Sequence, residues 1–445
     1  MWLIKPIPKK TTGIISDLKN LRPISLLPVA LKIAESVLRG QLSLFFDVNN
    51  ILPNIQSGFR MGFSTATCLC NVVDSCLGSI DKRQLTSITL LDMSSAFDTI
   101  DFNLLIAKLH YYGIHGSVFD WLISYLRNRF QSTVLKLSDG SLSFSQFREL
   151  RSGVPQGSVL GPLLFSLFTA DLQHVPKNCG IHMFADDFQL TYHFTSDRCG
   201  YACQAINSDL CDISNWASRN SLKLNPAKYQ HLLVGSSSML QRIDVVPIYI
   251  DGELIPVLDS VRNLGLIMDR HLRFTEHVNK VCRAVYLCLK SMYCFKNLLD
   301  TRTKLTLVNA LVMPHFHYCD VVYGPRLTNE DRNRLQKMQN HAVRFITPVP
   351  RFAHITPFIR DLGLLKLHEM RFIHYACLIE QILETGVPGY LHSKLVLRST
   401  LHGRDLRDIN IRLHIPEHRS SSYKASFSYC GALICNHVLD VLKLS

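Results

Sequence analysis

Residues 180–194 constrain the fold of this chain more than any other segment. Apolar residues occupy every second position on both sides of a central break: Ile181, Met183 and Ala185 before it, and Phe188, Leu190, Tyr192 and Phe194 after it. A period of two is typical of strands with one buried face, so the segment predicts a β-hairpin. Asp186 and Asp187 stand at the break, where the chain turns. Adjacent like charges repel, so this pair favours a compensating cation such as Mg2+, which prefers oxygen ligands. A lone Asp-Asp pair is more often ordinary turn chemistry.

A third carboxylate ends another predicted strand. Residues 87–92 form an apolar, β-branched run that finishes on Asp92, and a helical stretch follows until Gly113. The apolar and long side chains of that stretch fall near one helix face: Leu104, Leu105, Lys108, Leu109 and Tyr112. A strand that ends on an acid just before a helix holds a metal ligand on a rigid element. For Asp92 alone, a solvated strand end explains the pattern equally well.

Residues 152–165 form a loop of small residues that opens another helix. Gly153 and Gly157 permit close backbone approach, and Gln156 offers both a hydrogen-bond donor and an acceptor. Pro162 suits the first turn of the helix that follows. Beside paired acids such a loop suits contact with a nucleotide, although in isolation it fits any tight turn.

Taken in order, three motifs resemble the palm motifs of reverse transcriptases: LDMSSAFD at 91–98, GVPQGSVLGP at 153–162 and FADD at 184–187. Their wording is similar to non-LTR (LINE-type) retrotransposon enzymes, and most like the jockey group. Further segments match the same family in order: 7–9, 21–27, 56–60 with 64–65, 224–228, 263–269 and 336–344. The resemblance covers nearly the whole chain and is strongest over residues 22–269.

The resemblance implies a right-hand polymerase of the α/β (α+β) class. Its parts would be incomplete fingers (1–86), a ferredoxin-like palm with an antiparallel sheet (87–268) that carries a fingers insertion at about 121–152, a helical thumb (269–380) and a C-terminal region (381–445). Family members usually carry an endonuclease domain and more fingers sequence before the first motif, so an N-terminally truncated chain is implied. A catalytically inactive remnant that only binds RNA or DNA is the alternative.

The implied activity is RNA-directed DNA polymerisation, with dNTPs added to a primer 3′-hydroxyl on an RNA template. Asp92 and Asp186 would bridge two Mg2+ ions, or Mn2+, with Asp187 beside them. Lys228 matches a lysine proposed to protonate pyrophosphate, and a solvated surface lysine is its alternative. A nucleotide cyclase, another two-metal palm enzyme, fits less well because its signature places Gly-Gly before an acidic pair.

Five more residues match positions that bind the dNTP. Lys9 and Arg22 match contacts to the triphosphate, which suits the forked guanidinium of Arg. Gln156 and Gly157 would lie near the sugar and the templating pair. Phe97 matches the bulky residue that excludes a ribose 2′-hydroxyl, and a plain core aromatic is its alternative.

Charge and helical periodicity point to a polyanionic partner. Lys and Arg number 48 against 35 acids, a formal charge of +13, and residues 270–375 contain 17 of these bases against 7 acids. Two amphipathic helices are predicted there, from apolar residues at 278–292 and 335–345. Their basic residues are expected to follow a duplex backbone, with a merely solvated face as the alternative: Lys280, Arg283, Lys290, Lys337 and Arg344.

The 14 cysteines suit buried small hydrophobes of an intracellular chain, and none forms Cys-x-x-Cys, so the family's zinc knuckle is absent. His315, His317 and Cys319 alternate as on one strand face, but a zinc site there lacks a second ligand pair. The most apolar stretch, 159–170, is too short to span a bilayer. Asp139-Gly140 predicts a hairpin turn between 133–138 and 142–144.

Overall fold

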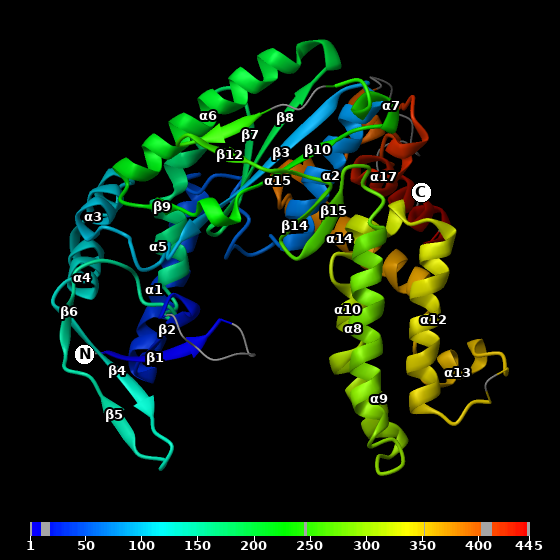
Figure 1. Cartoon of the computed structure of the whole chain (residues 1–445), viewed down its shortest axis with the longest axis horizontal. Helices are drawn as coiled ribbons and strands as arrows, with labels where there is room; N and C mark the ends of the chain where they lie inside the picture. The colour runs from blue at the N-terminus through cyan, green and yellow to red at the C-terminus, as the bar shows by residue number, and fades with distance from the viewer. Residues whose placement is uncertain (1, 10–17, 244–246, 351, 402–411, 443–445) are drawn as a thin grey trace.

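The computed structural model describes residues 2–9, 18–243, 247–350, 352–401 and 412–442. A mixed sheet spans the top of the view in Figure 1, and two arms descend from it on either side. The sheet order is β13-β10-β3-β8-β7, and β9 also pairs with β3. These strands are β3 (Leu85–Ser94), β7 (Gly180–Phe184), β8 (Asp187–Phe194), β9 (Lys223–Leu224), β10 (Gln230–Val234) and β13 (Val257–Leu258).

The four central strands have the antiparallel order of a ferredoxin-like palm. Numbered along the chain as β3, β7, β8 and β10, they lie in the order 4-1-3-2. The predicted hairpin of residues 180–194 is confirmed as β7 and β8, and the predicted strand at 87–92 lies within β3. Helices α2 (Thr65–Asp81) and α6 (Cys199–Arg219) pack against these strands. Ile88 and Leu190 are buried in the resulting core, so the sheet is held rigidly on its apolar faces.

The first arm combines a small sheet with helices. Its strands lie in the order β2-β1-β4-β5, and β6 pairs with β4. They are β1 (Trp2–Pro8), β2 (Leu21–Leu26), β4 (Arg129–Lys136), β5 (Leu142–Phe144) and β6 (Arg148–Leu150). The Asp139-Gly140 hairpin is confirmed between β4 and β5. The helices are α1 (Val29–Val48), α3 (Phe102–Tyr111), α4 (Gly116–Leu126) and α5 (Gly161–Phe168), and Pro162 lies in the first turn of α5 as predicted.

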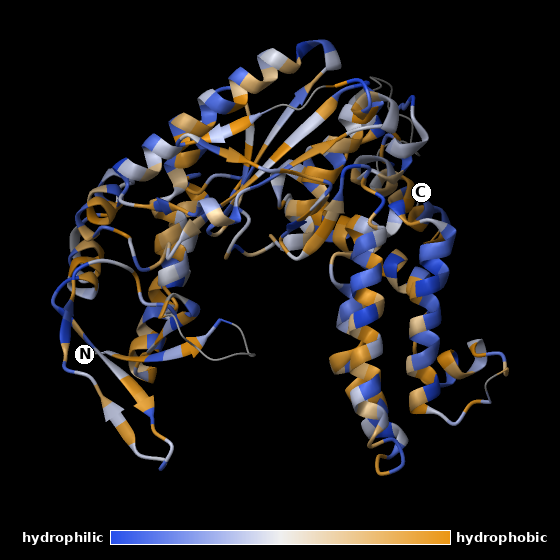
Figure 2. Ribbon diagram, viewed as in Figure 1, coloured by the Kyte–Doolittle hydropathy of each residue, from blue (hydrophilic) through white to orange (hydrophobic). Residues whose placement is uncertain are grey.

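The second arm is helical. The two predicted amphipathic helices are confirmed as α8 (Thr275–Tyr293) and α12 (Asn329–Ile346), which pack together beside α9 (Thr301–Leu311). Figure 2 shows hydrophilic and hydrophobic residues mixed along both long helices. Their apolar sides are buried at positions such as Val285 and Leu335. A short hairpin, β14 (Ser260–Asn263) and β15 (Leu266–Asp269), connects the main sheet with α8.

The C-terminal helices pack on α2. Helices α15 (Gly389–His392) and α17 (Phe427–Leu442) contact α2, and α14 (Leu367–Thr385) packs on α17. The Asp74 carboxylate of α2 accepts hydrogen bonds from Lys394 at 2.6 Å and from both the backbone and the hydroxyl of Ser428. A buried ion pair of this kind fixes the C-terminal segment to the main sheet.

The predicted strand at His315, His317 and Cys319 is wrong. Residues 313–317 form helix α10 (Met313–His317), with Pro314 in its first turn, and Cys319 lies beyond it with a positive φ of 55°. Alternation over five residues is too short to separate a strand from a turn of helix, and proline favours the helix start. Of the helices described, none is both long and apolar enough to cross a membrane. The sheet with its two arms confirms the predicted right-hand polymerase fold.

Candidate active site

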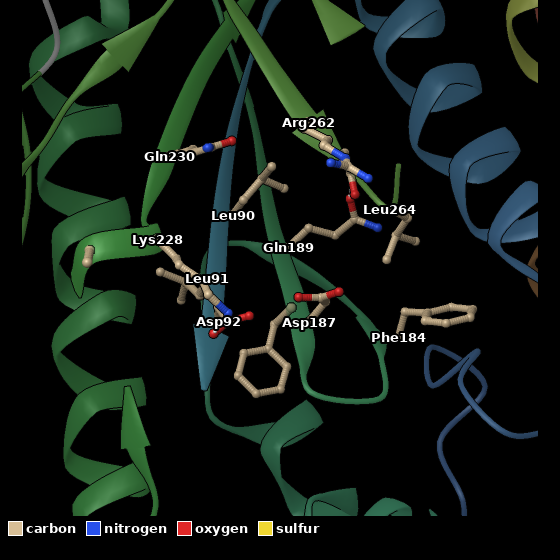
Figure 3. A pocket seen from close by; sticks show the side chains of 13 residues that line it. Leu90, Leu91, Asp92, Phe184, Asp187, Gln189, Lys228, Gln230, Arg262 and Leu264 are labelled. Atoms are coloured by element: carbon tan, nitrogen blue, oxygen red, sulfur yellow. Dashed lines mark hydrogen bonds and ion pairs between the residues drawn. The ribbon is translucent and has the colours of Figure 1, made fainter. Parts of the chain in front are cut away.

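The sheet register brings the predicted carboxylates together. Asp92 of β3 lies directly opposite Asp187 of β8, and Phe184 pairs with Asp187 across the hairpin. Ala185 and Asp186 are therefore the two turn residues. Figure 3 shows Asp92 and Asp187 side by side on neighbouring strands. Asp92 thus meets Asp186 and Asp187, which follow about 95 residues later in the chain, at one end of the sheet.

The carboxylates perturb one another strongly. The Asp187 side chain is exposed at one edge, but nearby protein atoms remove much of its hydration. This loss of hydration and the charges of Asp186 and Asp92 together raise the pKa of Asp187 to about 7. Partial burial also raises the pKa of Asp186, while Lys228 and Arg22 oppose that shift. The cluster therefore holds more negative charge than its surroundings neutralise.

Lys228 supplies the nearest positive charge. Its ammonium donates to Asp92 Oδ2 at 2.7 Å, and its side chain is 60% exposed whereas that of Asp92 is 13% exposed. Asn225 fixes the same strand end, because its backbone N–H donates to the Asp92 carbonyl at 2.9 Å. Lys228 therefore places a positive charge directly beside the cluster of acids.

The donor set fits a hard divalent cation. Carboxylate oxygens are the ligands that Mg2+ prefers. The pKa of Asp187 is raised by burial first and then by the charges of Asp186 and Asp92, and such an ion would neutralise those charges. Within the described ranges, no three His, Cys, Asp or Glu side chains already converge as a coordination site. Asp92 nevertheless lies close enough to Asp187 for their side chains to interact, while its Oδ2 also accepts a hydrogen bond from Lys228 at 2.7 Å.

The Gln-Gly loop lies against the segment that follows β3. Gln156 Nε2 donates to both carboxylate oxygens of Asp98, at 2.9 and 3.0 Å. The backbone N–H of Val154 donates to the Phe97 carbonyl at 2.7 Å. Gly153 has a φ of +86°, and a Cβ there would lie 2.8 Å from Asp98 backbone atoms, so a glycine is required. The structure therefore brings Gln156 and Phe97 together on one side of the acids.

The predicted triphosphate residues lie on the first arm. Lys9 follows β1 and Arg22 belongs to β2, and both are exposed. Their charges reach the site: Lys9 opposes the burial that raises the pKa of Asp98, and Arg22 does the same for Asp186. The Ser25 N–H donates to the Gln156 carbonyl at 2.7 Å and joins β2 to the loop. Gly157, with a φ of +99°, packs closely on Ser25.

Phe97 is half-buried between two aromatic rings. It stacks on Phe165 with centroids 4.9 Å apart and meets Phe59 edge-on at 6.2 Å. One part of its ring is therefore fixed by packing, while another part remains open to a ligand.

The predicted nucleic-acid residues of α8 and α12 differ in their surroundings. Arg283, Lys290 and Lys337 are exposed. Lys280 is also exposed, but its ammonium donates to the Gly265 carbonyl at 3.0 Å and so holds the β14–β15 turn. Arg344 is only half-exposed. Three of the five residues, Arg283, Lys290 and Lys337, are therefore exposed and, within the described part of the chain, make no such side-chain bond to the backbone of another element.

A cavity of about 270 Å³ borders the acids. Asp92, Asp187 and Lys228 line one side, and Arg262 and Asn263 of β14 line another (Figure 3). The Asn263 amide donates to Gln189 of β8, which ties this hairpin to the strand that carries Asp187. Sequence patterns did not single out Arg262 or Gln189, since neither contact is visible without the tertiary fold.

Gln56 was also missed as a site residue. It belongs to segment 56–60, which resembles the family, but the sequence pattern indicates no function for this residue. The structure places its side chain against the β7–β8 turn, where Gln56 Oε1 accepts from the Ala185 N–H at 2.9 Å. The sequence shows only that a polar residue stands in a motif that resembles the family, and this alone does not indicate a contact with the turn.

Residues 7–268 match the family model described as reverse transcriptase (RNA-dependent DNA polymerase). A probable RNA-directed DNA polymerase from transposon BS of Drosophila melanogaster is 30% identical over 87% of this chain and 42% of its own length. The RNA-directed DNA polymerase from mobile element jockey of Drosophila funebris is 27% identical over 79% of this chain and 38% of its own. Apo telomerase from Candida tropicalis aligns with 88% of this chain and 69% of its own, at 13% identity and a TM-score of 0.41.

The chain thus spans about two fifths of the length of these curated relatives. The family match, in contrast, extends over more than half of this chain and contains all three acids and the Gln-Gly loop. The protein therefore belongs to the reverse transcriptase family.

Proposed function

We propose that this chain is an RNA-directed DNA polymerase that adds dNTPs to a primer 3′-hydroxyl on an RNA template. The observation that carries the proposal is the register of β3 and β8, which sets Asp92 opposite Asp187 with Asp186 at the adjoining turn. The relatives named as RNA-directed DNA polymerases of transposons support the reaction. Because the chain spans only part of their length, its activity on its own belongs to the proposal.

Asp92, Asp186 and Asp187 would hold two Mg2+ ions, or Mn2+. Enzymes of this family use divalent metal ions, and when bound, such ions lower the pKa of the attacking hydroxyl and neutralise charge on the phosphates. The chain itself contributes rigidity, since two of the acids lie on paired central strands. Lys228 contacts Asp92 at 2.7 Å and so places a positive charge beside that carboxylate.

Lys228 is proposed as the proton donor to pyrophosphate. Its side chain is 60% exposed, so the ammonium is free to turn from Asp92 toward a leaving group on the solvent side.

The loop and the first arm would bind the nucleotide. Arg22 and Lys9 carry positive charge on the side of the acids where a triphosphate would extend. Gln156 is oriented by Asp98, which leaves its amide oxygen available to the sugar or the templating pair. Gly157 lets the loop approach β2 closely. Phe97, fixed on Phe165, would fill the volume of a 2′-hydroxyl.

The helical arm would hold the RNA–DNA duplex. Arg283, Lys290 and Lys337 are exposed on α8 and α12 and suit contact with backbone phosphates. Lys280 would act less directly, through the β14–β15 turn whose Gly265 carbonyl it binds. Arg344, half-exposed, is proposed as a weaker contact.

Primer extension on an RNA template with a DNA primer, dNTPs and Mg2+ tests the proposal. Asp92→Asn should abolish extension, because it removes a metal ligand that acts as part of one unit. Asp259→Asn is the matched control, since the Asp259 side chain is 85% exposed and pairs with Arg270 at the surface. A folded wild-type chain that binds the hybrid without extending it would instead favour the binding-only remnant.

A further inference from the structure

The turn that carries Asp186 has a backbone conformation that its sequence does not favour. Ala185 has a φ of +56°, in the left-handed region that residues with a Cβ rarely adopt. Such a conformation persists only where the surrounding structure holds it in place. Since Ala185 directly precedes both acids, whatever holds this residue also sets where their carboxylates point.

Gln56 supplies that restraint from a segment about 130 residues away in the chain. Its side chain is completely buried, and its Oε1 accepts two backbone hydrogen bonds, from Ala185 and from Gly58, each at 2.9 Å. Its Nε2 is also buried and makes no hydrogen bond within the part of the chain that the structure describes. The fold therefore uses the oxygen of this amide rather than its N–H groups.

The backbone of residues 55–57 forms hydrogen bonds with β7, the strand before the turn. The Met183 N–H donates to the Ile55 carbonyl at 2.9 Å, and the Ser57 N–H donates to the Met183 carbonyl at 2.8 Å. A Cβ on Gly58 would lie 2.4 Å from the Ala185 nitrogen, which is closer than a real Cβ approaches an atom of a distant residue. Residues 55–58 therefore lie as near to the turn as backbone atoms allow.

The same segment also touches the nucleotide side of the site. Phe59 follows Gly58 and meets the Phe97 ring edge-on at 6.2 Å. Residues 55–59 thus contact both the acidic turn and the residue proposed to exclude a 2′-hydroxyl. Movement of this segment would alter both.

We propose that Gln56 is a positioning residue, whose amide oxygen fixes Ala185 so that Asp186 and Asp187 face Asp92. The proposal rests on the proposed function, because the value of that geometry lies in gathering metal ligands. A role in core packing alone makes a different prediction: an apolar side chain of similar length would then serve equally well. Residues that orient metal ligands typically change metal affinity 10- to 100-fold when lost.

Gln56→Met separates the two roles, because it keeps the length of the side chain and removes the acceptor. Gln56→Glu keeps an acceptor oxygen, and burial keeps such a carboxyl neutral. Gln339→Met is the matched control, since Gln339 is equally buried but lies on α12 and binds the Leu365 carbonyl. Gly58→Ala is a second variant that should push the turn away by direct contact.

Two measurements on the purified chain decide the proposal, and neither requires turnover. Site-resolved hydrogen exchange should show the Ala185 amide exchanging at least about tenfold faster in Gln56→Met than in wild type, because a buried N–H loses its acceptor. It should remain protected in Gln56→Glu and Gln339→Met. Mn2+ binding, followed by electron paramagnetic resonance, should weaken about 10- to 100-fold in Gln56→Met and in Gly58→Ala.

Unchanged Ala185 exchange and unchanged Mn2+ affinity in Gln56→Met would overturn the proposal. Equal weakening of Mn2+ binding in Gln339→Met would overturn it as well, since the effect would then follow general destabilisation. Failure of the proposed function looks different: wild type would bind Mn2+ and protect Ala185, yet would not extend a primer.

Discussion

Substitution of Phe97 by valine tests how this site would distinguish deoxyribonucleotides from ribonucleotides. The Phe97 ring stacks on buried Phe165 at 4.9 Å and an interplanar angle of 26°, so it cannot turn aside without losing that contact. A 2′-hydroxyl would therefore have to enter volume that the ring already fills. Forcing extra atoms into packed space costs about 1–3 kcal/mol, which corresponds to a factor of roughly 5–150.

Phe97→Val should consequently lower the ratio of kcat/KM for dNTP over rNTP by about 5- to 150-fold. Use of dNTPs should fall only modestly. The variant also loses a stacked aromatic pair worth about 0.5–1.5 kcal/mol, so a small drop in stability is expected. A fully buried core phenylalanine would instead cost about 3–5 kcal/mol on truncation.

The assay is single-nucleotide primer extension with each substrate, together with thermal unfolding of the same preparations. Phe119→Val is the control, because Phe119 is also half-buried but lies on α4 outside the site. Its substrate ratio should equal that of wild type. A Phe97→Val ratio that stays constant while stability collapses would refute the steric argument and leave Phe97 as a core residue.

Three further predictions concern charge. With metal removed by EDTA, Asp187 in the folded chain, with its pKa raised to about 7, still holds a proton between about pH 4 and 7 that the unfolded chain has already lost. The Tm should therefore fall as pH rises through that window, and it should fall less in Asp187→Asn, where the raised pKa of Asp186 remains. Replacement of Arg283 and Lys337 by Gln should lower the salt slope of hybrid binding by about 0.7–0.9 for each lost phosphate contact, and an unchanged slope would make both merely solvated. Lys394→Met should lower the free energy of unfolding, measured by chemical denaturation, by about 3–5 kcal/mol, because Asp74 stays buried without its cation. A decrease under about 1 kcal/mol would show that this ion pair does not hold the C-terminal segment in place.

Local patterns predicted the elements of the site but not their contacts. Alternation at 180–194 was enough for β7 and β8, because one face of each strand is buried and a period of two follows. The pairing of Asp92 with Asp187 depends on strand register between segments about 95 residues apart, and only the motif resemblance placed them together. Amphipathic spacing likewise predicted α8 and α12.

Other contacts could not be predicted from the sequence, because they join residues that lie far apart in the chain. The prediction that Lys280 contacts nucleic acid stays a prediction, but the hydrogen bond from its ammonium to the Gly265 carbonyl could not be foreseen from periodicity. Gln56 gave no signal because its partner, the Ala185 N–H, belongs to another part of the chain. The His315 alternation failed for a local reason, since Pro314 starts a helical turn there.

Under the proposed function, the three acids at the end of the β3–β8 pair would carry RNA-directed DNA polymerisation. The most direct measurement is primer extension on an RNA template by wild type and by Asp186→Asn, with the folding of both confirmed by circular dichroism. We expect Mg2+-dependent extension by wild type and none by the variant, because a missing carboxylate disables the whole metal-binding unit. Extension by Asp186→Asn at the wild-type rate would contradict the proposed function.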